Sequence, residues 1–210
     1  MKTYPSIPSH KDIDLTEQKF YLFDKLDGSN IRAEWSAKTG FSKFGSRTQL
    51  LTEDQTTLYP SIASFNVKYA EELDRRFRAA KIERAVVFFE WFGPGSFAGS
   101  HSADPAEMTP VVIDIAVYKK GMMVPEKFLE FMYGLPTPKL LYHGVVTEKV
   151  IAEIRHRLLG GMTFEGVVGK GEKFVQKTGG PITFKIKSYA WLDHLKTICD
   201  GNEELYSQLK

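Results

Sequence analysis

The chain has 210 residues, 42% of them hydrophobic, and its 28 lysines and arginines nearly balance its 26 aspartates and glutamates. This composition is typical of a globular protein and excludes wholesale disorder. The net charge of +2 excludes a histone-like polycation, so charge alone makes only a weak case for nucleic acid. At ~150 residues per domain, the length predicts one or two domains.

Cysteine content and hydropathy narrow the protein class further. Cys199 is the only cysteine, which excludes an intramolecular disulfide and a cysteine-based zinc site. No run of about 18 apolar residues is present, so we expect no membrane span. Residues 1–17 are polar, contain two prolines and lack the apolar core of a signal peptide. We therefore expect a protein of the cytoplasm.

The first quarter of the sequence predicts strands separated by turns. Apolar and aromatic residues run over 19–27 and end in a turn at 27–29. Apolar and polar residues then alternate over 30–36, which is typical of a half-buried strand. A second turn at 37–40 leads to a third strand over 41–47. We expect these strands to form an antiparallel meander.

The rest of the chain mixes helices with strands. Between residues 66 and 82 apolar side chains recur every three or four positions, which predicts an amphipathic helix capped by Ser64 or Asn66. Further strands are expected at 85–92, 111–118, 163–169 and 182–189, and helices at 125–133, 148–159, 189–199 and 203–209. No repeat or long linker is visible. The pattern predicts one α+β domain over residues 1–210, with a mainly antiparallel sheet and a short helical tail at about 189–210.

Two glutamates interrupt apolar strands. Glu90 shares a strand face with Phe88 and Phe92, where a carboxylate costs several kcal/mol unless it is paired or faces a polar cleft. Glu165 stands alone within 163–169 and precedes a glycine, which lets another group approach the backbone. Each glutamate could instead be a strand-end carboxylate turned toward solvent.

Three lysines also stand out. Lys25 and Asp27 share a strand face, and burial or nearby cations would lower the pKa of Lys25 and make its amine nucleophilic. Lys185 and Lys187 share a face of the last strand, with their Cα atoms roughly 7 Å apart. The simpler interpretations are a strand-end lysine beside a turn aspartate, and lysines on the exposed face of an edge strand.

Taken in order, these residues match a known series of motifs. The sequence resembles the covalent nucleotidyltransferase superfamily of polynucleotide ligases and mRNA-capping enzymes, whose nucleophile motif is Lys-x-Asp-Gly. The matching segments are Lys25–Gly28, Ser46–Arg47, Phe89–Gly93, Val112–Ile115, Glu165–Val168 and Lys185–Lys187. Ser29–Asn30 is closer to RNA ligases, and residues 92–99 resemble a segment common in bacterial and phage RNA ligase domains. The nucleophile motif alone is weakly specific, whereas the complete ordered series is specific.

The resemblance implies an ATP-dependent RNA ligase. In this mechanism Lys25 attacks the α-phosphorus of ATP, expels pyrophosphate and retains AMP. AMP then passes to a 5′-phosphate, and a 3′-hydroxyl displaces it to seal the strand. Each step is attack on a phosphorus that carries negative oxygens, so positioning and cationic stabilisation dominate. The resemblance assigns Lys185 and Lys187 to the α-phosphate, and Glu165 to Mg²⁺ or Mn²⁺, with Asp27 as a second metal candidate.

The resemblance also implies contacts with the rest of the nucleotide. Glu90 is expected to accept a hydrogen bond from a ribose hydroxyl, and Arg47 to contact phosphate or ribose. Asp24 is expected to read the adenine amino group. Ile113 stands where relatives often place an aromatic residue that stacks on the purine, so an aliphatic contact is expected there. Asp27 is also expected to orient Lys25.

The expected partner is RNA, in single strands, a nicked duplex or an RNA/DNA hybrid, with the protein acting as a monomer in the cytoplasm, or in the host cytoplasm if it is phage-encoded. Five lysines and one glutamate lie within 166–190, so the balanced total hides a basic tract. Only 23 residues follow Lys187, and no appended OB-fold is expected. Alternatives are a DNA-nick ligase or a GTP-dependent guanylyltransferase on the same fold, an inactive nucleic-acid-binding domain, and a generic α+β domain with surface lysines.

Overall fold

The structure is a computed structural model that describes residues 1–16 and 18–210, so Glu17, the last residue of the polar N-terminal stretch, lies outside the described residues. Its contacts divide the chain into two compact units, each built from three separate segments. Unit 1 consists of Met1–Ser6, Gly28–Thr137 and Phe174–Pro181, and unit 2 consists of Ile7–Asp27, Pro138–Lys173 and Ile182–Lys210. That the chain behaves as one domain stays a prediction.

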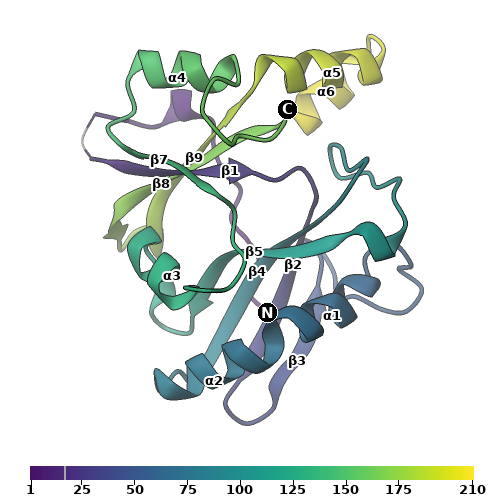
Figure 1. The fold of residues 1–210 in the computed structure, drawn as a ribbon, viewed down its shortest axis with the longest axis vertical. Coiled ribbons are helices and arrows are strands. Elements are labelled where there is room, and N and C mark those ends of the chain that lie inside the picture. The colour runs from purple at the N-terminus through teal and green to yellow at the C-terminus, as the bar shows by residue number, and fades with distance from the viewer. Residues whose placement is uncertain (17) are drawn as a thin grey trace. The chain divides into compact units, whose positions relative to one another are not determined.

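Unit 1 is organised around an antiparallel sheet that has five strands in the described residues, in the order β3-β2-β4-β5-β6 (Figure 1). The strands are β2 (Ser29–Ser36), β3 (Gly40–Gly45), β4 (Arg84–Phe92), β5 (Thr109–Val117) and β6 (Gly121–Met122). The strands predicted at 30–36, 41–47, 85–92 and 111–118 are therefore confirmed, with boundaries that differ by about two residues.

Helices pack against one face of this sheet. They are α1 (Pro60–Phe65), the π-helical turn η2 (Asn66–Ala70), α2 (Glu71–Ala79) and α3 (Pro125–Phe131). The short 3₁₀ turn η3 (Pro105–Glu107) lies between β4 and β5 in the chain and buries no residue. α1, η2 and α2 are continuous, and their apolar face buries Phe65 and Phe77 completely. Phe65 stacks on Phe89 of β4, and Phe77 packs against Trp35 of β2. This aromatic layer is the core of unit 1.

The start of the long helical stretch differs from the prediction. The predicted cap at Ser64 or Asn66 is wrong, because the helix begins at Pro60 and Asn66 lies inside it with helical backbone angles. Proline is favoured at the first helical position, since the N–H that it lacks has no intrahelical partner there. The apolar period continues back to Phe65, so the buried face reaches beyond the predicted cap.

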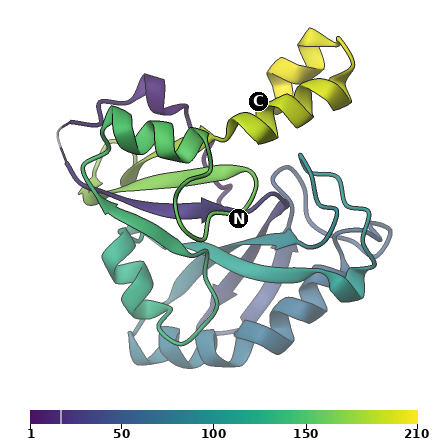
Figure 2. The same cartoon turned by 45° about the horizontal axis from the view of Figure 1, so that its top comes forward.

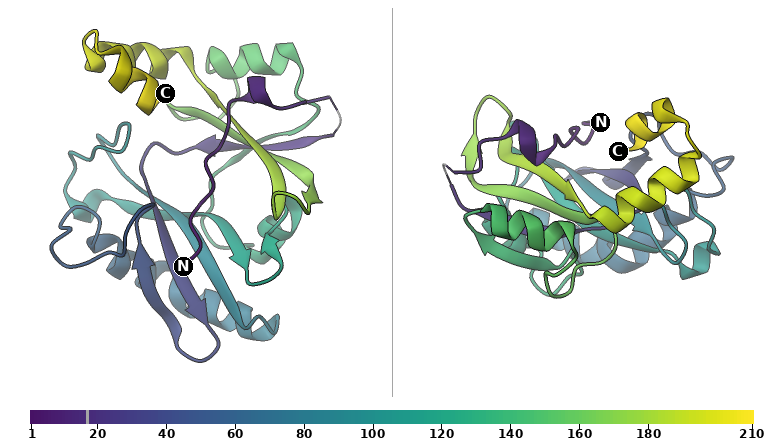
Figure 3. Two further views of the ribbon diagram at one scale, coloured as in Figure 1. Left: turned by 180° about the vertical axis from the view of Figure 1, so that it is seen from behind. Right: turned by 90° about the horizontal axis from the view of Figure 1, so that it is seen from above.

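Unit 2 is organised around a second sheet, in the order β7-β1-β8-β9 within the described residues. The strands are β1 (Phe20–Lys25), β7 (Leu140–Gly144), β8 (Gly166–Val175) and β9 (Gly180–Lys187), and the tip of the β8–β9 hairpin is counted with unit 1. The helices are η1 (His10–Asp12), α4 (Glu148–Arg155), α5 (Tyr189–Cys199) and α6 (Glu203–Leu209). The last two follow each other as a helical pair at the C-terminus (Figures 2 and 3).

The predicted N-terminal meander is wrong for its first strand. β2 and β3 do form a hairpin, but β1 pairs with β7 on one edge and with β8 on the other. β1 is therefore an inner strand of the unit 2 sheet, which explains why Phe20, Leu22 and Phe23 are all buried. Alternation within a strand cannot reveal this, because the strand's partners lie more than a hundred residues along the chain.

None of the helices in the described residues combines the length and the apolar sequence that crossing a membrane requires.

Candidate active site

A charged cluster lies at the strand ends of unit 2. Lys25 ends β1 and pairs in register with Gly166, the first residue of β8, so Glu165 lies beside it. The Lys25 ammonium is 2.7 Å from Glu165 Oε2, and the Lys187 ammonium at the end of β9 is 3.2 Å from Glu165 Oε1. One carboxylate therefore bridges two ammonium groups that are 162 residues apart in the chain.

The position of Glu165 depends on the glycine that follows it. Gly166 has a φ of +145°, and a Cβ there would collide with the carbonyl oxygen of Ile186 in β9. The close approach of the two strands draws Glu165 toward Lys187, and Ser188 fastens the same segment by donating its N–H to the carbonyl oxygen of Glu165 at 2.8 Å. β8 thus begins at Gly166, whereas the sequence predicts a strand from Thr163.

Both buried members of this cluster are charged. Glu165 is 3% exposed and Lys187 is 8% exposed, and such groups are stable only when they are paired. Burial lowers the pKa of Lys187 to about 8, and the neighbouring ammonium groups of Lys25 and Lys185 act in the same direction, while Glu165 opposes the shift. The Lys187 ammonium also lies 3.5 Å from the ring centroid of Trp191, a cation–π contact.

Trp191 connects this cluster to Asp27. The indole N–H donates a hydrogen bond to Asp27 Oδ2 at 2.6 Å, so a single side chain contacts both Lys187 and Asp27. Ser188 caps α5 by accepting a hydrogen bond from the backbone N–H of Trp191, which fixes the first turn of the helix. The sequence analysis missed Trp191, although its position four residues after Lys187 was an available signal.

Asp24 lies on β1, directly before Lys25, and is 4% exposed. Its Oδ1 accepts hydrogen bonds from the backbone N–H of Thr163 at 2.8 Å and from the Thr163 hydroxyl at 3.0 Å. Burial raises the pKa of Asp24, and the two hydrogen bonds partly oppose this shift. The carboxylate therefore holds the segment before Glu165 in place.

The C-terminal helix reaches the paired lysines. Lys185 donates from its ammonium to the carbonyl oxygen of Lys210 at 3.0 Å, and Lys187 donates to the carbonyl oxygen of Leu209 at 3.1 Å. These two lysines thus share one strand face, as the sequence predicts, and both contact the end of α6. The sequence analysis did not anticipate that the helical tail would take part.

The remaining candidates lie in unit 1. Glu90 is half-buried on β4, and Arg47 is exposed in the loop after β3, two residues beyond the end of the strand. The pairing of β5 with β4 skips Ile113, since Phe88 pairs with Asp114 and Phe89 with Val112. Ile113 therefore occupies a β-bulge, a device that redirects side chains and is common beside active sites.

Tyr4 is a residue of this region that the sequence analysis missed. Its phenol donates to Asp114 Oδ2 at 2.7 Å, and its ring packs against Phe88 at 5.0 Å between centroids. Burial raises the pKa of Tyr4 well above its usual value, as do Asp114 and, more weakly, Glu90, whereas Arg47 lowers it. Glu90 and Arg47 are thus both close enough to act on this phenol.

The loop after β4 is held by a histidine. His101 contacts Ser29 Oγ through Nε2 at 2.8 Å and Ser96 Oγ through Nδ1 at 2.9 Å. Ser96 Oγ also accepts the backbone N–H of Gly93 at 3.0 Å. Burial lowers the pKa of His101, which favours the neutral ring that both serines can share. This network ties the segment over 92–99 to the residue that follows the nucleophile motif.

The donor set for a metal ion consists of few groups. Among the described residues, no cluster of three or more His, Cys, Asp or Glu side chains could hold a metal. Mg²⁺ is usually bound by one or two carboxylates together with waters and substrate phosphates. Glu165, with Asp27 as a second candidate, fits that kind of site and does not fit an all-protein metal cage.

Comparisons with known proteins identify the fold. No protein-family model and no curated protein matches the sequence. The chain is similar to the structure of Naegleria gruberi RNA ligase with PPi, at 15% identity and a TM-score of 0.68 over 94% of this chain and 58% of that one. It is also similar to a mutant of that ligase with AMP and Mn, at 15% identity and a TM-score of 0.67 over 92% and 58% of the two chains. A further mutant of the ligase, with ATP and Mn, is similar at 15% identity and a TM-score of 0.66, over 90% of this chain and 57% of that one.

This likeness shows the fold. The predicted α+β class with mainly antiparallel sheets is confirmed, and the fold is shared with an RNA ligase. No OB-fold is evident in the part of the chain that the structure describes. The chain spans 57–58% of the length of these three structures.

Proposed function

We propose that this chain is an ATP-dependent ligase of the covalent nucleotidyltransferase superfamily, which joins 5′-phosphate and 3′-hydroxyl ends of RNA through AMP bonded to Lys25. The observation that carries the proposal is the carboxylate bridge from Glu165 to Lys25 and Lys187. These residues come from three separate motifs of the ordered series, in a fold shared with an RNA ligase. Ser29–Asn30 and the segment over 92–99 favour the bacterial and phage-type RNA ligases.

The first step transfers AMP to the protein. Lys25 Nζ attacks the α-phosphorus of ATP, a nitrogen–phosphorus bond forms, and the bond to pyrophosphate breaks. The attacking amine must be neutral, and Glu165 Oε2, 2.7 Å from Nζ, is positioned to accept its proton. Lys187 and Lys185 supply positive charge to the phosphate oxygens, where charge develops in the transition state.

The other candidate residues contact the nucleotide. In this proposal Glu90 accepts a hydrogen bond from a ribose hydroxyl, Arg47 contacts phosphate or ribose, and Ile113 contacts the purine. Asp24 accepts a hydrogen bond from the adenine amino group, and Asp27 orients Lys25. Mg²⁺ or Mn²⁺ bound to Glu165, with Asp27 as the second candidate, would neutralise charge on the phosphate oxygens.

AMP then passes from Lys25 to the 5′-phosphate of the polynucleotide, and the 3′-hydroxyl displaces AMP as the phosphodiester bond forms. RNA is the proposed partner, and the exposed Lys173 and Lys177 add positive charge for its phosphates. We propose that a monomer performs these steps.

The decisive experiment is intact-mass spectrometry of the protein after incubation with ATP and Mg²⁺ or Mn²⁺. We expect one AMP per chain, and none in Lys25→Ala, because the phosphoramidate forms on that amine. Lys19→Ala is a matched control, since Lys19 lies just before the same strand, and it should gain AMP normally. A Lys25→Ala protein that still gained AMP would refute the assignment of the nucleophile.

Substrate assays separate the alternatives. Labelled GTP bonded to the protein in place of AMP would indicate a guanylyltransferase, and sealing of nicked DNA in preference to RNA would indicate a DNA ligase. A correctly folded protein that binds RNA but never gains a nucleotide would be the inactive binding domain. Sealing should be compared on nicked duplex RNA, a broken RNA loop and free single strands, with RNA or DNA at each end.

A further inference from the structure

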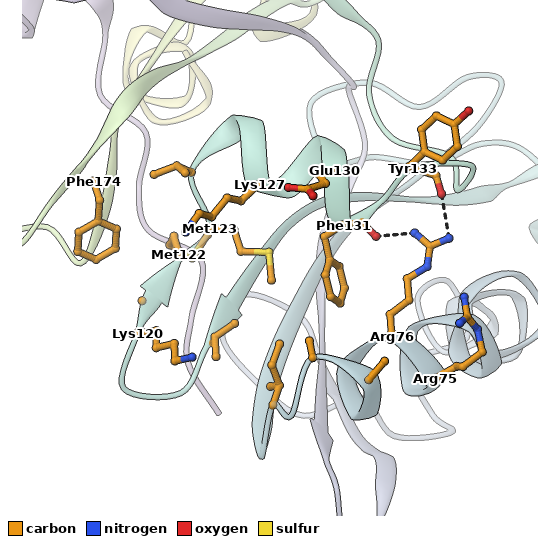
Figure 4. Close-up of a pocket in the computed structure, with 16 residues that line it drawn as sticks. Arg75, Arg76, Lys120, Met122, Met123, Lys127, Glu130, Phe131, Tyr133 and Phe174 are labelled. Atoms are coloured by element: carbon orange, nitrogen blue, oxygen red, sulfur yellow. Dashed lines mark hydrogen bonds between the residues drawn. The ribbon is translucent and has the colours of Figure 1, made fainter.

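A groove in unit 1 has no role in the proposed ligase chemistry. It has a volume of about 840 Å³ and is lined by α2, the β5–β6 turn, α3 and Phe174 (Figure 4). This volume lies within the range of ligand-binding clefts. Apolar side chains make up much of its lining, among them Ile82, Met122, Met123 and Phe131. We call it the α2–α3 groove.

The shape of the groove is fixed by one arginine. Arg76 of α2 donates hydrogen bonds to the carbonyl oxygen of Phe131 at the end of α3 and, at 2.8 Å, to that of Tyr133 (Figure 4). Its Nε also donates to Glu72 at 2.6 Å. These contacts fasten the C-terminal end of α3 to α2, so the groove is preformed and a ligand need not order it.

The edge of the groove carries aromatic rings and positive charge. Tyr133 is 84% exposed and Phe174 is 38% exposed, which is unusual for large aromatic side chains. Lys120 and Lys127 are exposed, and neither ammonium has an ion-pair partner in the described part of the chain. Glu130 is the acidic residue of the lining. The groove therefore combines an apolar floor with a net positive edge.

We propose that the α2–α3 groove binds an acidic amphipathic helix of a partner protein. Methionine, aromatic residues and arginine are enriched at the centres of protein interfaces, and methionine adapts to varied apolar surfaces. An amphipathic helix would place its apolar face on Met122, Met123 and Phe131, and its acidic side chains beside Lys120 and Lys127. RNA fits less well, because two lysines at the edge of an apolar floor do not form the positively charged groove that follows an RNA backbone.

Fluorescence anisotropy with a designed peptide tests the proposal. The probe is a fluorescein-labelled helix of about 15 residues, with leucine and phenylalanine at helical spacing and glutamate elsewhere. We expect binding that weakens at least about ten-fold in Met123→Glu and in the pair Lys120→Glu and Lys127→Glu. Lys38→Glu, in the exposed turn between β2 and β3, is the matched control and should bind normally. AMP transfer to Lys25 should be unchanged in all variants.

Three results would overturn the proposal: equal binding of a scrambled peptide of the same composition, full binding by the doubly charge-reversed variant, or displacement of the peptide by a short RNA. The last would reassign the groove to nucleic acid. Because both exposed lysines can be changed without altering the core, a folding failure of Met123→Glu would still leave the charge reversal as a test.

A second inference concerns α6 and rests on the proposed function. None of the side chains of α6 is buried, and the helix follows two residues with left-handed backbone angles, Asp200 and Gly201. Its last carbonyl oxygens, at Leu209 and Lys210, accept hydrogen bonds from Lys187 and Lys185. Cations at a helix C-terminus stabilise it, so the two lysines help to hold this exposed helix, which also contacts α5.

We infer that α6 is a displaceable cover of the phosphate-binding lysines. The carbonyl oxygens of Leu209 and Lys210 each accept one N–H of these ammonium groups, so they compete with the α-phosphate that the proposed function assigns to the same lysines. The cover therefore reduces the affinity for ATP by competing for the same two ammonium groups. It is an autoinhibitory contact within unit 2.

Two readouts test this cover. In Tyr206→Pro, which removes the backbone N–H that donates to Asn202 at 3.0 Å, α6 should unwind. Lys185 and Lys187 should then be acylated several-fold faster by an amine-reactive reagent, as mapped by mass spectrometry, and the KM for ATP in AMP transfer should fall several-fold. Ser207→Ala, an exposed change in the same helix, is the control.

The two readouts separate failure of the cover from failure of the enzyme. Unchanged acylation in Tyr206→Pro would overturn the cover even if Lys25 gains AMP in every variant. Unchanged KM with faster acylation would show that α6 covers the lysines without regulating them, which also overturns the inference. Faster acylation without AMP transfer in any variant would refute the proposed function and leave the contact standing.

Discussion

Among the described residues, unit 1 contains one almost completely buried carboxylate, Asp114, and unit 2 contains two, Asp24 and Glu165. Asp114 and Glu165 are stabilised in different ways. Asp114 of unit 1 is 2% exposed and accepts the phenol of Tyr4, a neutral donor, at 2.7 Å. Glu165 of unit 2 is 3% exposed and is bridged by two ammonium groups. Asp114 accepts from a neutral donor, whereas Glu165 pairs with two ammonium groups and raises the pKa of one of them, Lys187, against the lowering effect of burial.

The surroundings extend the contrast. The ring of Tyr4 packs on Phe88, so the donor to Asp114 is fixed by the aromatic contacts of unit 1. Lys187, one of the partners of Glu165, also donates a hydrogen bond to the carbonyl oxygen of Leu209 in α6 and lies over the ring of Trp191. The comparison teaches that two carboxylates of similar burial can differ in the chemistry of their partners, and the proposed function depends on that difference.

The largest expected effect separates the two carboxylates directly. In the proposed mechanism Glu165 accepts the proton of Lys25, so Glu165→Ala should reduce AMP transfer at least about a hundred-fold. It should also cost about 3 kcal/mol of unfolding free energy, since Lys187 is left buried without its counter-ion. Intact-mass kinetics and urea unfolding measure the two effects. Asp114→Asn is the matched control and should keep AMP transfer near the wild-type rate. Wild-type kinetics in Glu165→Ala would show that Glu165 has no role in AMP transfer and does not differ from Asp114 in this respect.

The next effect is a dependence on pH. Because the pKa of Lys187 is lowered to about 8, its ammonium loses its proton as the pH rises through that value, while ordinary lysines stay charged. The kcat/KM for AMP transfer should therefore decline above about pH 8, since this ratio reports groups of the free enzyme. In Lys187→Arg the decline should move to higher pH, because guanidinium stays protonated. Identical alkaline limbs in both proteins would show that another group titrates.

A moderate effect is expected in unit 1. Tyr4→Phe removes the donor to Asp114 Oδ2 and should lower the unfolding free energy by about 1–3 kcal/mol, as urea unfolding would show. AMP transfer by the folded protein should remain close to wild type, since the phenol supports structure. Tyr118→Phe, at an exposed tyrosine, is the control and should change stability by less than about 0.5 kcal/mol. A selective loss of AMP transfer without loss of stability would instead give Tyr4 a role in the chemistry.

The smallest expected change in AMP transfer concerns Trp191. Trp191→Phe keeps an aromatic ring beneath Lys187 but removes the indole hydrogen bond to Asp27 and part of a fully buried ring. We therefore expect a few-fold slower AMP transfer and a loss of about 1–3 kcal/mol in stability. Trp191→Leu removes the ring as well and should be slower still. Equal rates for both variants would mean that the cation–π contact contributes nothing to the site.

Local patterns of apolar and polar residues predicted most of the secondary structure. Runs and periods of apolar residues located β2, β4, β5 and α5, because each buries apolar side chains in a core. The sequence also located α6, although none of its side chains is buried. The patterns missed β7, whose exposed and half-buried residues show no clear alternation. They also placed the start of the first long helix too late. Isolated charges in apolar strands singled out Lys25, Glu90 and Glu165, since unpaired charges are costly in such positions.

By itself, the sequence determined which residues carry unusual chemistry and the order in which they occur, because both are properties of composition and local period. Only the tertiary structure decided that β1 leaves the N-terminal strands for a sheet with β7 and β8, and that Glu165 bridges Lys25 and Lys187. It also decided that α6 contacts the paired lysines. These contacts depend on strand register and on a close backbone approach at Gly166, which join segments far apart in the chain and leave no trace in the local period of either segment.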